Sequence, residues 1–206
     1  DRKEAKELAP DAAKRLKDWK TDILKAPGKG DIDRLSALAR GVERLWAEAA
    51  ARLTDTRRGL RRPIDVWQAD LGLTPARYTR AQAEQTLRNP DGSLGRLRTL
   101  MDAWIGLWFW PLGAVDGESI ALPTWHEWLE VAEALVPPVA DDVVDRTPTG
   151  QLDMFDHLDA LLAAEDAAEP GRVAVAELMA AHPWLGWAVG LAEAEGAWHW
   201  ELELAP

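Results

Sequence analysis

Apolar residues recur at helical spacing from the start of this chain. The first such segment follows Pro10, and Asp11 is placed to cap it. A second begins at Asp31 and is long enough for about six helical turns. Its apolar positions, three or four residues apart, are Ile32, Leu35, Leu38, Val42, Leu45, Trp46, Ala49 and Leu53. The glycine-rich stretch 26–30 separates the two segments, so the pattern predicts an antiparallel helical hairpin.

Cap and turn residues divide the next part of the chain into shorter helices. Thr74 and Pro75 have the order of an N-cap followed by a proline at the first helical position. The Asn-Pro-Asp-Gly sequence at 89–92 predicts a turn. Ser93 can then cap a helix that stops before Pro111.

The second half of the chain contains further helical patterns. Thr124 and Glu127 have capping-box spacing and begin a helix that ends at Pro137-Pro138. Helical patterns resume over 151–167 and 172–181, and a last one runs from Pro183 to Gly196.

Two short segments, 63–68 and 198–204, instead alternate with period two and are predicted to be strands. The predicted fold class is therefore mainly α: a helical domain with an N-terminal αα-hairpin and one or two short strands. The chain divides into a basic helical hairpin with an arginine-rich turn over 1–62 and an acidic, tryptophan-rich helical domain, ending in a strand, over 63–206. We expect the two parts to form one compact unit of a larger protein.

The composition excludes several classes of site. The chain of 206 residues has no cysteine, which removes disulfides, thiolate zinc sites and cysteine nucleophiles. No apolar run approaches the roughly 20 residues that span a bilayer, and no signal peptide is visible. We therefore expect a soluble, cytoplasmic protein with no membrane contact.

The formal net charge of −11 is unevenly distributed. Residues 1–100 hold 22 of the 24 lysines and arginines against 15 acids, a balance of +7. Residues 101–206 hold only Arg146 and Arg172 against 20 acids, a balance of −18. This asymmetry indicates an anionic partner for the first half, attraction between the halves, or a solvated surface sorted by chance.

Four arginines within six positions are the strongest functional signal in the residues themselves. Arg57, Arg58, Arg61 and Arg62 follow the basic hairpin and would form a concentrated positive patch. Because arginine can bind phosphate through two parallel hydrogen bonds, the patch predicts contact with a nucleic-acid backbone, and these four arginines are the candidate residues. The alternative is a set of salt bridges to the acidic second half.

Twelve tryptophans stand beside only two phenylalanines and one tyrosine. Most fall on the apolar side of a helical pattern, which favours core packing over base stacking. Residues 104–110 are apolar on every side of a helix, a pattern typical of burial. We therefore predict that Trp104 and Trp108 belong to the core, an exposed stacking platform being the alternative.

Metal and acid/base chemistry find little support in the sequence. The four histidines, at positions 126, 157, 182 and 199, are scattered. Asp153 and His157 lie one helical turn apart, but no second histidine accompanies them, so we predict no metal site. No pair of acidic residues stands out as a catalytic pair, and no catalytic residue is assigned.

Three stretches of the chain carry a resemblance to a known family. They are residues 16–46, Leu100–Leu112 with Leu122-Pro-Thr124, and Trp198-His-Trp-Glu-Leu-Glu-Leu204. They resemble the helical spacer and two motifs of large bacterial adenine-specific DNA methyltransferases. These are the type IIG restriction–modification enzymes and their relatives in the DISARM and BREX phage-defence systems. One departure is Ile105-Gly106, where the family commonly has Cys-Ala.

The resemblance implies a part of such an enzyme that lacks its chemistry. In the family, a glycine-rich loop binds S-adenosylmethionine, and Asn-Pro-Pro-Tyr accepts the flipped adenine. This sequence contains neither, since Asn89-Pro90 continues as Asp91-Gly92. The chain is thus expected to be a helical insert between those motifs, with no cofactor of its own and no activity alone. Its expected partners are DNA, the rest of the methyltransferase chain and other defence-system subunits.

Two alternatives stay open. One is a scaffold domain whose basic and acidic halves dock partner proteins without touching nucleic acid. The other is a stand-alone hydrolase or transferase, for which no convergent polar motif is visible.

Overall fold

The computed structural model describes residues 7–23, 28–60, 78–111, 120–136, 162–163 and 172–203. All regular elements in these ranges are helices, which confirms the mainly α class. In chain order they are α2 (Pro10–Ile23), α3 (Lys29–Gly59), α4 (Arg80–Arg88), α5 (Ser93–Gly106), the 3₁₀ turn η1 (Leu107–Phe109), α6 (Trp125–Leu135), α8 (Val175–Ala181), α9 (Pro183–Ala194) and α10 (Trp200–Glu203). Among these described helices, none has the length and apolar character needed to cross a membrane.

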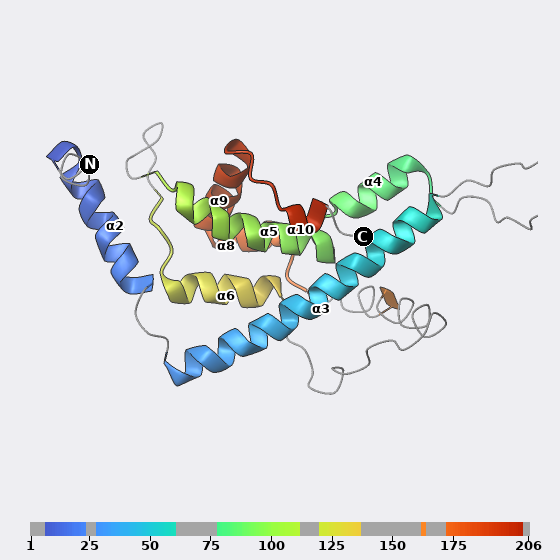
Figure 1. The fold of residues 1–206 in the computed structure, drawn as a ribbon, viewed down its shortest axis with the longest axis horizontal. Coiled ribbons are helices and arrows are strands. Elements are labelled where there is room, and N and C mark those ends of the chain that lie inside the picture. The colour runs from blue at the N-terminus through green and yellow to red at the C-terminus, as the bar shows by residue number, and fades with distance from the viewer. Residues whose placement is uncertain are drawn as a thin grey trace, which may run out of the picture.

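Helix α5 lies at the centre of the molecule (Figure 1). It packs most extensively against α9 and also contacts α3, α4 and α6. The crossing with α9 is close because Gly106 has no side chain: a Cβ there would stand 2.1 Å from the carbonyl oxygen of Ala188. Leu45 of α3, Leu129 of α6 and Leu185 of α9 are fully buried in one shared core. The long basic helix α3 and the acidic later helices therefore share that core.

Local capping signals set several helix boundaries. The predicted capping box is confirmed at α6, where Thr124 accepts a hydrogen bond from the Glu127 backbone and Glu127 accepts one from the Thr124 backbone. Thr79 and Gln82 form a second box, so α4 begins at Arg80. The predicted start at Thr74-Pro75 lies outside the described residues. Gly92, rather than Ser93, is the N-cap of α5.

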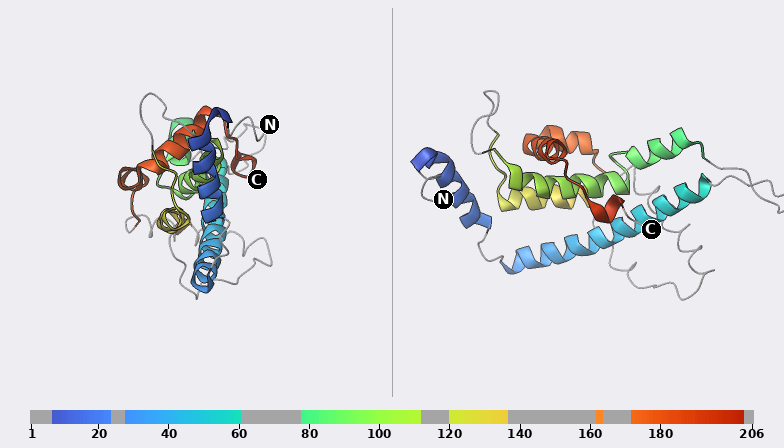
Figure 2. Two further views of the ribbon diagram at one scale, coloured as in Figure 1. Left: turned by 90° about the vertical axis from the view of Figure 1, so that its left-hand side faces the viewer. Right: turned by 45° about the horizontal axis from the view of Figure 1, so that its top comes forward.

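Both helices of the predicted N-terminal hairpin are present, as α2 and α3. In Figure 1 and in the right-hand view of Figure 2, α2 lies at a wide angle to α3 and does not run along it. Trp19 is the residue of α2 that packs against the core cluster.

The tail prediction was wrong: residues 200–203 form the short helix α10, not a strand. Burial does alternate from residue 198 to residue 200, because His199 is buried between the exposed Trp198 and Trp200. Leu202 is also buried; it lies three positions after His199, and its N–H donates to the His199 carbonyl at 2.9 Å. A helical turn satisfies these backbone groups locally, whereas a strand needs a neighbouring strand, which the described ranges do not offer. The predicted strand 63–68 and, except for residues 162–163, the predicted helix 151–167 lie outside the described residues.

The burial prediction for two tryptophans of the central helix was also wrong. Trp104 is 41% exposed and Trp108 is 67% exposed, while Trp110 and Trp184 are buried. The rings of Trp104 and Trp108 meet edge to face, with centroids 6.4 Å apart. Trp104 meets Trp128 of α6 in the same way at 5.4 Å, and Trp128 stacks on Trp125 at 5.8 Å. These four side chains, named the tryptophan ladder below, pack on one another at the end of α5, where the helix is only partly covered.

Candidate nucleic-acid interface

The C-terminal end of α3 and helix α4 form a basic projection, named here the arginine prong. It comprises residues 52–60 and 78–90 and extends beyond the central helices (Figure 1). It contains five arginines and only two acidic residues, Asp55 and Glu84. The arginines are Arg52, Arg57, Arg58, Arg80 and Arg88. In a chain with a net charge of −11, this local balance of +3 marks the prong as a candidate site for an anionic partner.

Tyr78 joins the two helices of the prong. Its hydroxyl donates to Asp55 Oδ2 at 2.9 Å, and its backbone N–H donates to the Gly59 carbonyl at 3.1 Å. The ring lies directly on Gly59, where a Cβ would be 2.1 Å from Tyr78 Cδ2. Ala83 of α4 is buried as well. The absence of a side chain at Gly59 therefore lets the ring close the junction between α3 and α4.

A cleft of about 690 Å³ opens between the prong and the start of α5. Its lining is part polar and part apolar, and it includes side chains able to donate hydrogen bonds to phosphate oxygens. The lining residues are Arg52, Gln85, Thr86, Leu87, Arg88, Asn89, Pro90, Gly92, Ser93 and Leu94.

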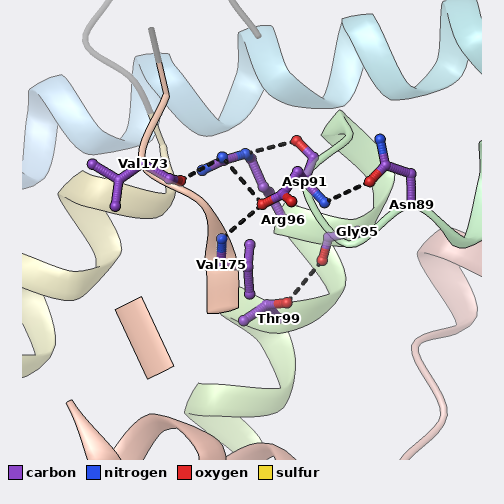
Figure 3. Close-up of polar contacts among 7 residues, drawn as sticks. All are labelled: Asn89, Asp91, Gly95, Arg96, Thr99, Val173 and Val175. Atoms are coloured by element: carbon purple, nitrogen blue, oxygen red, sulfur yellow. Dashed lines mark hydrogen bonds and ion pairs between the residues drawn. The ribbon is translucent and has the colours of Figure 1, made fainter. Parts of the chain in front are cut away.

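The wall of this cleft formed by the predicted Asn-Pro-Asp-Gly turn is held by a buried arginine (Figure 3). Arg96 is 1% exposed; its Nε donates to the Asp91 carbonyl at 2.8 Å and its Nη2 to the Val173 carbonyl at 2.7 Å. The Asp91 carboxylate in turn accepts the N–H of Val175 at 2.7 Å, at the first residue of α8. Gly95 lets α5 approach the turn, since a Cβ there would lie 2.3 Å from the Asn89 carbonyl. The cleft wall is thus fixed to α5 and α8.

A second buried charge cluster ties α3 to the same segment. Glu48 is fully buried and accepts from Arg44 Nε at 3.0 Å and from Arg172 Nη2 at 3.1 Å. The sequence held one signal for this contact, because Arg172 is one of only two basic residues in the acidic half. Its partner, 124 positions away, could not be identified from spacing.

The structure separates the four arginines that the sequence grouped as DNA-binding candidates. Arg57 is exposed and has no ion pair with any residue in the described ranges. Arg58 is half-buried and engaged within the chain. Arg61 and Arg62 lie outside the described residues. Of the four, Arg57 is therefore the one that the structure presents to solvent.

Salt bridges between the two halves, the alternative role for those arginines, occur elsewhere in the described part of the chain. Arg34 of α3 pairs with Glu133 of α6 through two hydrogen bonds of 2.8 Å. This pair raises the pKa of Arg34 and lowers the pKa of Glu133. Together with Glu48 and Arg172, it attaches α3 to the later segments without using Arg57.

Sequence reasoning also missed a buried pair between Asp102 of α5 and His199. His199 Nε2 lies 2.6 Å from Asp102 Oδ1, and both side chains are buried. The two residues are 97 positions apart, so no local pattern could reveal the contact. They do belong to two of the stretches that carry the resemblance, Leu100–Leu112 and Trp198–Leu204. The structure therefore brings those two stretches into direct contact.

Neither metal ligands nor relatives identify the site. Within the described ranges, no group of three or more histidine, aspartate or glutamate side chains is placed to hold a metal ion. The predicted pair Asp153 and His157 lies outside those ranges. The chain matches no protein-family model, and no curated protein or solved structure matches it either.

Proposed function

We propose that this chain is a helical insert of a bacterial adenine-specific DNA methyltransferase of a restriction–modification or phage-defence system. In this role it contacts the DNA backbone through the arginine prong and carries no methyl-transfer chemistry. The observation that carries the proposal is the prong itself, a concentration of arginines beside a cleft in a chain whose net charge is −11.

The chemistry of phosphate recognition supports this role. Arg57 and Arg88 are exposed, and neither has an ion pair among the described residues. An arginine without a carboxylate partner keeps its fork of N–H donors available for phosphate oxygens. Backbone contacts of this kind fix a protein on DNA without reading the base sequence.

The parent family is proposed from the three resembling stretches of sequence, two of which meet through Asp102 and His199. The glycine-rich loop through which the family binds S-adenosylmethionine does not occur in this sequence. We therefore place the cofactor and the target adenine in other parts of the parent enzyme.

A salt titration of DNA binding tests the proposal. The isolated chain should bind duplex DNA with an affinity that falls steeply with salt. Each arginine that contacts a phosphate contributes about 0.9 to the slope of log affinity against log salt. The Arg57→Ala, Arg88→Ala double variant should flatten the slope by about 1.8 and weaken binding to every DNA sequence alike.

Arg40→Ala is the matched control for that titration. Arg40 is an exposed arginine on the same helix α3, outside the prong. Its removal changes the net charge by the same amount as either single substitution but should leave the slope close to that of the unaltered chain. Equal losses from Arg40→Ala and Arg57→Ala would show general electrostatic attraction and contradict an interface at the prong.

A protein-docking scaffold is the second candidate, and the tryptophan ladder favours it. Trp108 and the adjacent Phe109 are large apolar side chains that are 67% and 47% exposed. Clusters of this kind commonly mark protein contacts. A chain that shows no salt-dependent DNA affinity would support this function over the first.

A further inference from the structure

We propose that Tyr78 is a positioning residue of the DNA interface, which holds the last turn of α3 in helical form so that Arg57 is fixed for phosphate contact. This inference rests on the proposed function, because it concerns the same prong. It assigns to an uncharged side chain a role that neither charge nor the arginine pattern indicates.

Tyr78 contacts Asp55 and Gly59, which lie on one face of α3. Asp55 and Gly59 are four positions apart and therefore lie one above the other on the helix surface. Tyr78 binds the first with its hydroxyl at 2.9 Å and the second with its backbone N–H at 3.1 Å. Its ring covers Gly59 between these two hydrogen bonds. Tyr78 therefore binds the final turn of α3 from one side.

Arg57 lies on the opposite side of that turn. It is two positions from Asp55 and two from Gly59, which places it about 200° around the helix from both. Its side chain is exposed there, while Asp55 and Gly59 are buried. Tyr78 thus contacts the side of the helix opposite Arg57, and the arginine faces solvent.

The end of a helix needs such support because its last carbonyl groups have no partners within the helix, and the final turn frays. The Tyr78 N–H provides one partner, for the Gly59 carbonyl. An arginine on an ordered turn loses less conformational entropy on binding than one on a frayed turn, so order at this site increases affinity. Removing the contacts that Tyr78 makes with Asp55 and Gly59 should therefore weaken DNA binding, although no charge is changed.

Gly59→Ala is the decisive variant because two effects oppose each other there. Alanine has a higher helix propensity than glycine, by up to about 1 kcal/mol, so propensity alone predicts a firmer last turn and DNA binding that is at least as tight. The new Cβ would, however, stand 2.1 Å from the Tyr78 ring and displace it. Gly30→Ala is the matched control, since it makes the same exchange near the other end of α3, where a Cβ meets nothing within 4 Å.

The experiment is a double-mutant cycle with Arg57→Ala, measured as the salt slope of binding to duplex DNA. We expect Gly59→Ala to flatten the slope by about 0.9, the contribution of one phosphate contact, and Gly30→Ala to leave it unchanged. In the Gly59→Ala background, Arg57→Ala should add no further change. Tyr78→Phe, which keeps the ring and removes the hydroxyl that bonds to Asp55, should move the slope in the same direction by less. Circular dichroism confirms that each variant retains its helices, and Tyr78→Phe carries the test if Gly59→Ala does not fold.

The outcomes separate this inference from the function on which it rests. An Arg57→Ala effect that is equally large with and without Gly59→Ala overturns the role of Tyr78 and leaves the DNA interface standing. An unaltered chain that shows no salt-dependent DNA binding overturns both.

Discussion

A buried imidazole needs a hydrogen-bonding partner, and at His199 that partner is Asp102. The short distance of 2.6 Å and the burial of both side chains give this contact more weight than a surface ion pair. It attaches the segment before α10 to the central helix α5. The flanking Trp198 and Trp200 are exposed, whereas His199 and Leu202 are buried and attach this segment to the core.

Asp102→Ala should lower the free energy of unfolding by about 3 kcal/mol, because it leaves the imidazole buried without its partner. Replacing both residues with apolar ones, Asp102→Leu with His199→Phe, should recover part of that loss, since no polar atom is then left unpaired. Urea denaturation of the two variants measures both values. A loss below about 0.5 kcal/mol for Asp102→Ala, the level of an ordinary surface change, would contradict the stabilising role of the pair.

At the scale of elements, local signals predicted what local contacts determine. Thr124 and Glu127 begin α6 as predicted, because a capping box is made within four residues. The tail was misjudged because burial alternates over residues 198–200 only, and so short an alternation fits both a strand and the approach to a helical turn. The Tyr78 contact with Asp55, the Arg172 contact with Glu48 and the His199 contact with Asp102 join residues 23, 124 and 97 positions apart. Spacing along one sequence carries no information on such pairs.

The capping box of α6 should make the stability of the protein depend on pH. Hydrogen bonds from the Thr124 backbone and side chain lower the pKa of Glu127 in the folded state. A lowered folded-state pKa means that the ionised carboxylate stabilises the fold above its unfolded pKa, and that this stabilisation is lost as the pH falls through the folded value. Glutamine at this position keeps the box but cannot ionise. The Tm of the unaltered chain should therefore fall more steeply below about pH 4 than that of Glu127→Gln, measured by thermal melts from pH 7 to pH 3. Parallel curves would contradict a stabilising role for this charge.

At the scale of the whole molecule, the two exposed features occupy opposite ends. The arginine prong lies at the end formed by α4, and the tryptophan ladder lies where α5 ends and α6 begins (Figure 1). The central helix α5 and its packing against α9 separate them. Changes at sites this far apart, with no shared partner, usually act independently on stability.

Changing the exposed aromatic residues at the ladder end should therefore leave both the fold and DNA binding intact. Trp108 and Phe109 are 67% and 47% exposed, so Trp108→Ala with Phe109→Ala should lower the free energy of unfolding by only about 1 kcal/mol in total. Trp184→Ala is the control: that ring is 7% exposed in the core, and its loss should lower the free energy of unfolding by about 3–5 kcal/mol. Denaturant melts measure stability, and the salt slope with duplex DNA should match that of the unaltered chain because no prong residue is changed. A flattened slope in the Trp108 and Phe109 variant would instead place nucleic acid on the ladder and contradict an interface confined to the prong.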